Sequence, residues 1–330
     1  MTGNGTERGQ GEAALQVRGL SKSYGSLKAV RDLSFEAFRG EIIGFLGPNG
    51  AGKTTAIRML STILPPDAGS FTLGGVAHTD AIAIRQRIGV LPESAGYPFQ
   101  QTGDEFISYH GRLFGHSPAR AREIGASLLQ EVGLGERASS RISSYSRGMR
   151  QRLGVARTLV NEPEVLFLDE PTLGLDPAGQ RQMLRLISDI ARQRQTTVIL
   201  STHFLDEVEQ ICSRVLILKQ GEVAAEGSIA DIKRQTAPRA ARFSVPPEMH
   251  DEALAHLAKA AGIAHAAPAN SEPGSIIATF ENGWMTENSR LGMNSAIRAL
   301  TDAEVPILSF ELEGSRLSDA FLSLTEEEPQ

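Results

Sequence analysis

Cysteine is almost absent from this sequence of 330 residues, and no apolar run in it is long enough to cross a membrane. The single cysteine, Cys212, excludes an internal disulfide and is typical of a reducing compartment. A membrane-spanning helix needs about 20 apolar residues, whereas the runs at 42–46 and 165–168 have only the length of buried strands. The polar N-terminus also lacks the apolar core of a secretion signal. The sequence therefore predicts a cytoplasmic chain that contacts a membrane only through a partner.

Positive charge is not in excess either. The formal net charge is −6, and 22% of the residues are charged, which is ordinary for a globular protein. Proteins that attract nucleic acid or anionic lipid through their overall charge are usually basic. The sequence therefore predicts no nucleic-acid partner.

The length fits two domains, and the composition changes along the chain. Residues 1–13 form a polar stretch that we expect to be a disordered tail. Residues 14–233 alternate β-rich runs with amphipathic helical stretches, which predicts an α/β domain with a largely parallel sheet. Residues 234–240 are polar and contain Pro238, so we expect a linker there. Residues 241–330 follow as a smaller accessory domain.

The smaller domain has its own pattern of elements. We expect strands at 242–245, 263–267, 275–280 and 306–312, with helices at 247–261, 288–301 and 315–324. The order β-α-β-β-α-β is typical of a ferredoxin-like α+β fold. No cluster here carries chemistry. Its histidines are scattered and lack converging cysteines or acids, so no metal site is expected among them (His250, His256 and His265).

A glycine-rich loop separates a strand-like run from a helical stretch that begins at Thr55. It reads Gly47, Pro48, Asn49, Gly50, Ala51, Gly52, Lys53 and Thr54, and matches G-x-x-x-x-G-K-[ST] in its proper context. The glycines let successive backbone N–H groups converge on phosphate oxygens, and the helix N-terminus favours the same anion. Lys53 is expected to neutralise phosphate charge, and Thr54 to ligate Mg²⁺. The eight loop residues and Thr55 are the expected binding residues for the nucleotide. The motif predicts a P-loop NTPase, but it leaves kinases, GTPases, helicases and transporters open.

Two acids, Asp169 and Glu170, follow the apolar run at 165–168. A buried strand that ends in carboxylates delivers them to the edge of the sheet where ligands bind in open α/β folds. We expect Asp169 to hold Mg²⁺ and Glu170 to act as general base toward the attacking water. Without the preceding glycine-rich loop, a helix cap or a solvated turn would be the simpler interpretation.

Residues 145–152, Tyr-Ser-Arg-Gly-Met-Arg-Gln-Arg, resemble the signature motif of ABC ATPases. The form is similar to that of ATP-binding subunits of ABC-2-type drug and antibiotic exporters. The resemblance implies that Ser146 and the N–H of Gly148 face the γ-phosphate held by the Lys53 loop of an opposite subunit. Arg147 stands where the common motif has a glycine, and we expect its guanidinium to help anchor the partner's nucleotide. An ordinary capped helix uses the same groups, so the two interpretations coexist.

The same resemblance assigns three further positions. Tyr24 matches the aromatic residue that stacks on adenine, and Asp176 lies in the D-loop, residues 173–177, which couples the two sites of the dimer. His203 matches the switch histidine that contacts the γ-phosphate. Taken alone, an isolated tyrosine is more often core packing, and a histidine after a strand is more often structural.

Glu93 departs from the family, which usually has glutamine at this Mg²⁺-contacting position. A carboxylate ligates Mg²⁺ well, but it would repel the γ-phosphate without the metal. The resemblance also implies a helical subdomain at about 94–160 that grips the membrane partner. Within it we expect Tyr97 and Phe99 to form an exposed aromatic pair that docks this partner.

The resemblance implies an ATPase that uses ATP and Mg²⁺ and works with a membrane-spanning permease subunit, and the expected direction of transport is export. It also implies a second nucleotide-binding subunit, expected to be a second copy of this chain, and a peripheral location on the inner face of the cell membrane. The alternative is a soluble ABC ATPase in a non-transport role such as cofactor assembly. An ordinary P-loop kinase or GTPase is a third interpretation, which the run at 145–152 disfavours.

Overall fold

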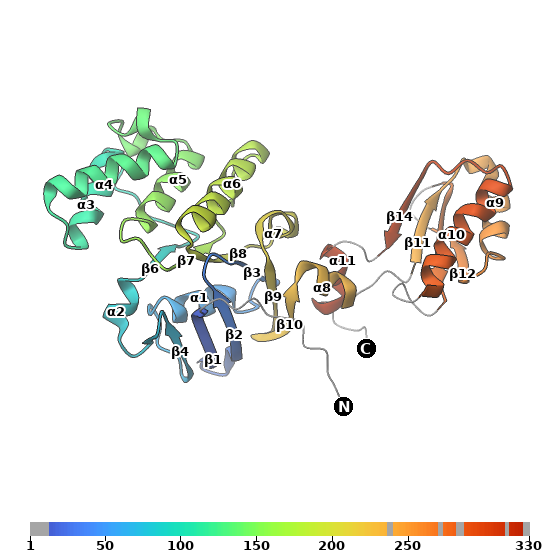
Figure 1. Ribbon diagram of the computed structural model, residues 1–330, viewed down its shortest axis with the longest axis horizontal. Helices are drawn as coiled ribbons and strands as arrows, with labels where there is room; N and C mark the ends of the chain where they lie inside the picture. Colours follow the sequence, from blue (N-terminus) through green and yellow to red (C-terminus); the bar gives the residue numbers. More distant parts are fainter. Residues whose placement is uncertain (1–12, 236–239, 270–272, 282–286, 314–316, 326–330) are drawn as a thin grey trace. The chain divides into compact units, whose positions relative to one another are not determined.

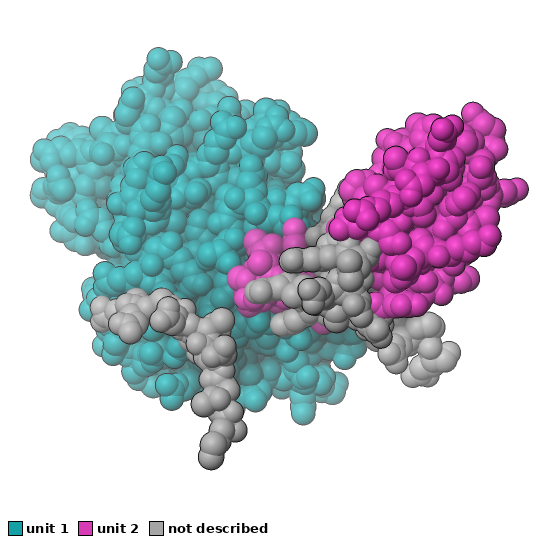
Figure 2. Space-filling model, turned by 45° about the vertical axis from the view of Figure 1, so that its right-hand side comes forward, with its two compact units in different colours: residues 1–226 teal, residues 227–330 magenta. Residues whose placement is uncertain are grey.

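The computed structural model describes residues 13–235, 240–269, 273–281, 287–313 and 317–325 (Figure 1). The chain forms two compact units, residues 1–226 and residues 227–330 (Figure 2). All but the last residue of the predicted N-terminal tail lie outside the described residues, and Ala13 begins the first strand. Among the described residues, no helix is both long and apolar enough to span a bilayer.

A six-stranded sheet forms the centre of the first unit, in the order β10-β9-β3-β8-β7-β6. The neighbouring strands from β9 to β6 pair in parallel, which confirms the predicted α/β class. All residues of β3, β7 and β8 are buried, because a parallel sheet is covered on both faces and its strands are therefore apolar runs. The strands are β3 (Ile42–Leu46), β6 (Ile88–Leu91), β7 (Val165–Asp169), β8 (Thr197–Ser201), β9 (Arg214–Lys219) and β10 (Glu222–Ser228).

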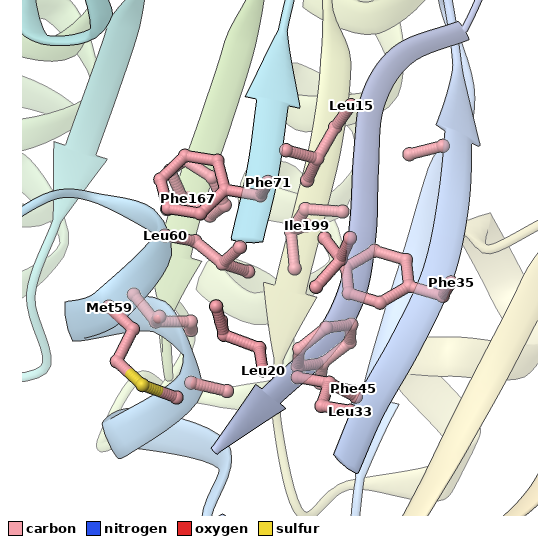
Figure 3. Packing of buried hydrophobic residues seen from close by; sticks show 14 of the residues in the cluster. Leu15, Leu20, Leu33, Phe35, Phe45, Met59, Leu60, Phe71, Phe167 and Ile199 are labelled. Carbon is pink, nitrogen blue, oxygen red and sulfur yellow. The ribbon is translucent and has the colours of Figure 1, made fainter. Parts of the chain in front are cut away.

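A second, antiparallel sheet, which the sequence pattern did not predict separately, has the order β2-β1-β4-β5. Its strands are β1 (Ala13–Tyr24), β2 (Leu27–Phe38), β4 (Ala68–Leu73) and β5 (Val76–Ala77). Side chains from both sheets and from helix α1 (Lys53–Leu60) share one apolar core (Figure 3). In it, the rings of Phe35 on β2 and Phe45 on β3 meet edge to face at 5.3 Å. This packing fixes the strand that leads into the glycine-rich loop.

The remaining helices of the first unit follow the strands. They are α2 (Ala81–Arg85), α3 (Gly103–Leu113), α4 (Pro118–Glu131), α5 (Arg147–Thr158), α6 (Pro177–Arg194) and α7 (Leu205–Ile211), with 3₁₀ turns at Gly135–Arg137 and Ile142–Ser144. Helices α3, α4 and α5 contact one another within the range where a helical subdomain is expected (Figure 1). Thr102 and Glu105 form a capping box that fixes the start of α3.

The expectation of an exposed aromatic pair at Tyr97 and Phe99 is wrong for Tyr97. Its ring packs 5.8 Å from that of Phe106, and its hydroxyl donates to the carbonyl of Arg150 at 2.8 Å. Tyr97 is therefore half-buried and ties α3 to α5, while Phe99 is 52% exposed.

The second unit contains a four-stranded antiparallel sheet in the order β12-β13-β11-β14. Its strands are β11 (Ala240–Ser244), β12 (Ile263–Pro268), β13 (Ser275–Phe280) and β14 (Ser309–Glu313), and its helices are α8 (Ile229–Gln235), α9 (His250–Leu257), α10 (Glu287–Asp302) and α11 (Leu317–Thr325). From β11 to β14 the elements follow the expected β-α-β-β-α-β order, with a 3₁₀ turn (Pro247–Met249) opening the first helical segment. The last strand begins later than predicted, at Ser309 rather than 306.

The predicted linker at 234–240 is partly wrong, because α8 includes Arg234 and Gln235. The hydroxyl of Ser228 accepts a hydrogen bond from the N–H of Asp231 at 3.0 Å and so caps this helix, and Ile232 is fully buried. A helix of seven residues is too short to show a clear apolar period in sequence. Ala240 already belongs to β11, and residues 236–239 lie outside the described residues.

Candidate active site

The glycine-rich loop curls between β3 and α1 around the side chain of Lys53. Gly52 has φ +104°, and a Cβ atom there would collide with the carbonyl of Ala29, so only glycine fits this position. The ammonium of Lys53 donates to the carbonyls of Gly47 at 2.7 Å and of Pro48 at 3.1 Å. Burial lowers the pKa of Lys53, against the opposing effect of two nearby acids, Glu170 and Asp169. A buried cation held only by carbonyl oxygens suits an anionic ligand.

A pocket of about 440 Å³ opens beside this loop. It is lined by eleven of the residues singled out from the sequence: Tyr24, Asn49, Gly50, Gly52, Lys53, Thr54, Thr55, Glu93, Asp169, Glu170 and His203. Leu27, Ala29, Leu173 and Ser201 complete the lining and were not predicted. Tyr24 is 46% exposed, so it is not a core residue. Of the predicted loop residues outside the lining, Gly47 and Pro48 hold Lys53, and Ala51 is buried.

The two acids at the end of β7, Asp169 in the strand and Glu170 directly after it, are held by the end of the neighbouring strand. The hydroxyl of Ser201 donates to Oδ1 of Asp169 at 2.8 Å, and the N–H of Glu170 donates to the carbonyl of Ser201 at 2.9 Å. Glu170 has φ +50°, a left-handed conformation that a non-glycine residue adopts at a cost and that is concentrated at functional sites. Ser201 could have been found by pairing β7 with β8 in parallel, because that register places Ser201 beside Asp169.

His203, which follows β8, lies over the carboxylate of Glu170. Its Nδ1 atom is 3.0 Å from each carboxylate oxygen, while its side chain remains 44% exposed. The ring packs 4.0 Å from that of Phe204. A carboxylate oriented in this way beside a buried lysine can accept a proton from a water molecule.

Three oxygen-bearing side chains suit a magnesium ion in this pocket. Thr54, Glu93 and Asp169 all line it, and hydroxyl and carboxylate oxygens are the ligands that Mg²⁺ prefers. Mg²⁺ usually binds through one or two carboxylates together with substrate phosphates. The donor set therefore fits an ion that arrives with a nucleotide.

The other predicted nucleotide-binding residues, Ser146, Arg147, Gly148 and Asp176, line a second pocket of about 410 Å³. Ser146 is the N-cap of α5, and its hydroxyl accepts from the N–H of Met149 at 3.2 Å. Asp176 caps α6 in the same way by accepting from the N–H of Gly179 at 3.1 Å. The N-termini of α5 and α6 thus border one pocket, which shares no lining residue with the pocket that contains Lys53.

Comparison with known proteins is consistent with this geometry. Residues 30–173 match the family model described as ABC transporter. The daunorubicin/doxorubicin resistance ATP-binding protein DrrA of Streptomyces peucetius is 36% identical over 316 residues, covering 94% of this chain and 92% of that protein. A Nod factor export ATP-binding protein I of Paraburkholderia xenovorans (strain LB400) is 43% identical over 219 residues, covering 66% of this chain and 71% of that protein.

Solved structures agree. An ATP-binding subunit of an ABC transporter is similar with a TM-score of 0.61 and 31% identity, covering 67% of this chain and 92% of that one. The cbiO1 protein of Clostridium perfringens, part of the ABC transporter complex cbiONQ, has a TM-score of 0.62 and 26% identity, covering 68% of this chain and 94% of that one. The chain belongs to the family of ABC transporter ATP-binding proteins, and it is an ATPase of this family.

Proposed function

We propose that this chain hydrolyses ATP as one of a pair of nucleotide-binding subunits and that hydrolysis powers export through a separate membrane-spanning subunit. The observation that carries the proposal is the division of the predicted site between two pockets. Lys53, Glu170 and His203 line one, and Ser146 and Gly148 line the other. Each pocket has half of the groups that the family's site requires. A second chain placed head to tail would bring the two halves together.

The D-loop supports this arrangement because it borders both pockets. Leu173 lines the pocket of Lys53, whereas the next residue, Gly174, lines the pocket of Ser146. The guanidinium of Arg147 lies against Gly174, since a Cβ atom built there would be 2.6 Å from one of its terminal nitrogens. A movement of the loop in one pocket would therefore be transmitted to the other.

In this proposal, the residues of the first pocket have separate roles in the binding and hydrolysis of ATP. Tyr24 stacks on the base, and the loop N–H groups with Lys53 bind the phosphates. Thr54, Glu93 and Asp169 hold Mg²⁺, which neutralises phosphate charge when bound. Glu170 takes the proton of the attacking water, and His203 orients that carboxylate from 3.0 Å. Ser146 and Gly148 of the opposite chain close the site at the γ-phosphate.

We place the docking site for the membrane subunit in a groove beside α3. Two adjoining hollows of about 290 and 870 Å³ share Arg85, Phe114 and Asn161 in their linings. Large apolar side chains are exposed along them: Ile63, Ile82, Leu113 and Phe114. Arginines outnumber acids in the two linings, with Arg85, Arg120 and Arg157 against Glu162. An apolar segment that carries acidic side chains would fit this surface.

Export is the direction favoured by the relatives. The relative that covers 94% of this chain is named for drug resistance, and others are named for Nod factor export. A role in cofactor assembly gains no such support. We further propose that the partner nucleotide-binding subunit is a second copy of this chain and that both copies sit at the cytoplasmic face of the membrane, attached through the permease.

The test of the site is the substitution Glu170→Gln. It should preserve ATP binding, abolish most phosphate release, and trap a dimer that is detectable by size-exclusion chromatography with ATP. Turnover at the wild-type rate in this variant would contradict the assignment.

The test of the groove is capture of the membrane partner from detergent-solubilised membranes. The double variant Leu113→Ser, Phe114→Ser should lose a polytopic partner that the wild-type chain retains. Tyr109→Ser is the matched control, because Tyr109 is 51% exposed on the same helix and lines neither hollow. Equal capture by all three proteins would remove the groove from the proposal.

A further inference from the structure

A buried carboxyl group lies behind the nucleotide pocket without lining it. Glu207, in the first turn of α7, is 6% exposed. Its Oε2 atom accepts hydrogen bonds from the hydroxyls of Thr172 at 2.8 Å and Thr202 at 3.0 Å. Both threonines are fully buried. Three polar side chains therefore form one network in a place where polar groups are costly unless paired.

The two threonines belong to the loops that carry the reacting groups. Thr172 follows Glu170 by two residues, and Thr202 immediately precedes His203. The Thr202 hydroxyl also accepts from the N–H of Phe204 at 3.1 Å, so the network reaches the backbone on the far side of His203. A single carboxylate oxygen thus joins the segment after β7 to the segment after β8.

We propose that Glu207 is a positioning residue for ATP hydrolysis, which holds the loops of Glu170 and His203 in the register that places these two side chains 3.0 Å apart. The backbone of Glu170 is in a left-handed conformation, and such strain persists only where the surroundings enforce it. The hydrogen bond from Thr172 supplies an anchor two residues away. The bond from Thr202 supplies the matching anchor for His203.

The chemistry of the network requires an acceptor and not a charge. Burial raises the pKa of Glu207, whereas the two hydroxyl donors act in the opposite direction. The carbonyl oxygen of a neutral carboxylic acid or of an amide accepts the same two hydrogen bonds. A glutamine at this position should therefore preserve the network, and an alanine should leave two buried hydroxyls without their acceptor.

The proposal rests on the assignment of Glu170 as the catalytic base, and the experiment separates the two. ATP hydrolysis and the affinity for a fluorescent ATP analogue are measured for Glu207→Ala, Glu207→Gln, Thr202→Val and the control Asp206→Ala. Asp206 is the neighbouring acid on the same helix and is exposed. We expect Glu207→Ala to lower kcat by about tenfold or more while the analogue's Kd stays within about twofold of wild type.

Rescue by the conservative variant distinguishes positioning from folding. Glu207→Gln should keep kcat within about threefold of wild type, and Asp206→Ala should not change it. Thr202→Val, which is nearly isosteric, should lower kcat. Its effect should not add to that of Glu207→Ala, because both substitutions remove the hydrogen bond between Thr202 and Glu207. If Glu207→Ala does not fold, the kcat values of Glu207→Gln and Thr202→Val still test whether Glu207 positions the two loops.

Two results overturn the proposal. Unchanged kcat in Glu207→Ala or in Thr202→Val, alongside loss of turnover in Glu170→Gln, would leave the base assignment standing and remove the role of Glu207. Loss of kcat in Glu207→Gln equal to that in Glu207→Ala would show that a charge, and not an acceptor, is required. Full turnover in Glu170→Gln would instead contradict the proposed function itself.

Discussion

The Nδ1 atom of His203 lies 3.0 Å from both carboxylate oxygens of Glu170. The two residues follow neighbouring parallel strands, β7 and β8, whose ends meet at one edge of the sheet. A histidine here can orient the carboxylate and respond to a phosphate in the same pocket. The pair thus connects the proposed base with the proposed sensor of the nucleotide.

Substitution of His203 tests this pair. We expect His203→Ala to lower kcat by about 10²-fold, since a positioned donor or acid–base group typically contributes at least this much. ATP affinity should change far less, because Lys53 and the loop remain. Phosphate release and nucleotide binding are measured side by side, with His256→Ala, an exposed histidine of α9, as control. Wild-type kcat in His203→Ala would contradict the role of the pair.

Glu93 stands at the position of the family's usual glutamine, and Glu93→Gln should therefore keep measurable ATPase activity. The amide oxygen can replace the carboxylate as a ligand, although the site loses one negative charge. We expect the Mg²⁺ concentration for half-maximal hydrolysis to rise. Activity as low as that of Lys53→Ala, measured over a Mg²⁺ titration, would show that the carboxylate itself is required.

The contact of Arg147 with Gly174 predicts how the D-loop tolerates a methyl group. Gly174 has φ +72°, where a non-glycine residue costs roughly 1–2 kcal/mol, and the atoms within 3 Å of an added Cβ are the far end of the exposed Arg147 side chain, which can swing away. Gly75→Ala is the matched control, because Gly75 has φ +76° and nothing lies within 4 Å of its added Cβ. Urea unfolding should therefore show similar losses for Gly174→Ala and Gly75→Ala, each roughly 1–2 kcal/mol and due to the backbone conformation alone. A clearly larger loss for Gly174→Ala, removed by adding Arg147→Ala, would show instead that the guanidinium is fixed against the loop.

The raised pKa of Glu207 predicts a pH dependence of stability. A carboxyl whose pKa is higher in the folded than in the unfolded chain contributes most to the free energy of unfolding at pH values below its unfolded pKa. This contribution is lost as the pH rises through the folded pKa. The glutamine of Glu207→Gln cannot ionise. The melting temperature of this variant minus that of wild type should therefore increase as the pH rises from 5 to about 8, and the two temperatures should converge toward lower pH. Calorimetry at several pH values measures the difference. A difference that increases toward low pH would show that folding lowers the pKa of Glu207 and does not raise it.

The glycine-rich loop, the acid pair and the central sheet were predictable because their residues are contiguous and their apolar runs are unambiguous. Ser201 and Glu207 were not, because their roles depend on partners 32 and 35 residues away in the chain. Tyr97 was misjudged because its ring packs against Phe106 of α3 and its hydroxyl donates to Arg150, 53 residues further along the chain. The roles of Ser146 and Asp176 across a dimer stay predictions, because one chain presents only their side of the interface.

The central claim is that each ATP is enclosed by two chains, and complementation tests it most directly. Lys53→Ala disables the loop of its own chain. Gly148→Asp places a negative charge where the partner's phosphates should bind, while an acid in the first turn of a helix is favourable to the fold. The Cβ of residue 148 has only Leu175 nearby, at 3.8 Å, so the substitution fits.

Each variant alone should be nearly inactive, but a mixed pair contains one complete site, formed by Lys53 of the Gly148→Asp chain and Gly148 of the Lys53→Ala chain. Mixing the two proteins should therefore restore ATP hydrolysis. Mixing Lys53→Ala with a chain that carries both substitutions should restore none. If the first mixture shows only the sum of the two separate activities, the site does not span two chains.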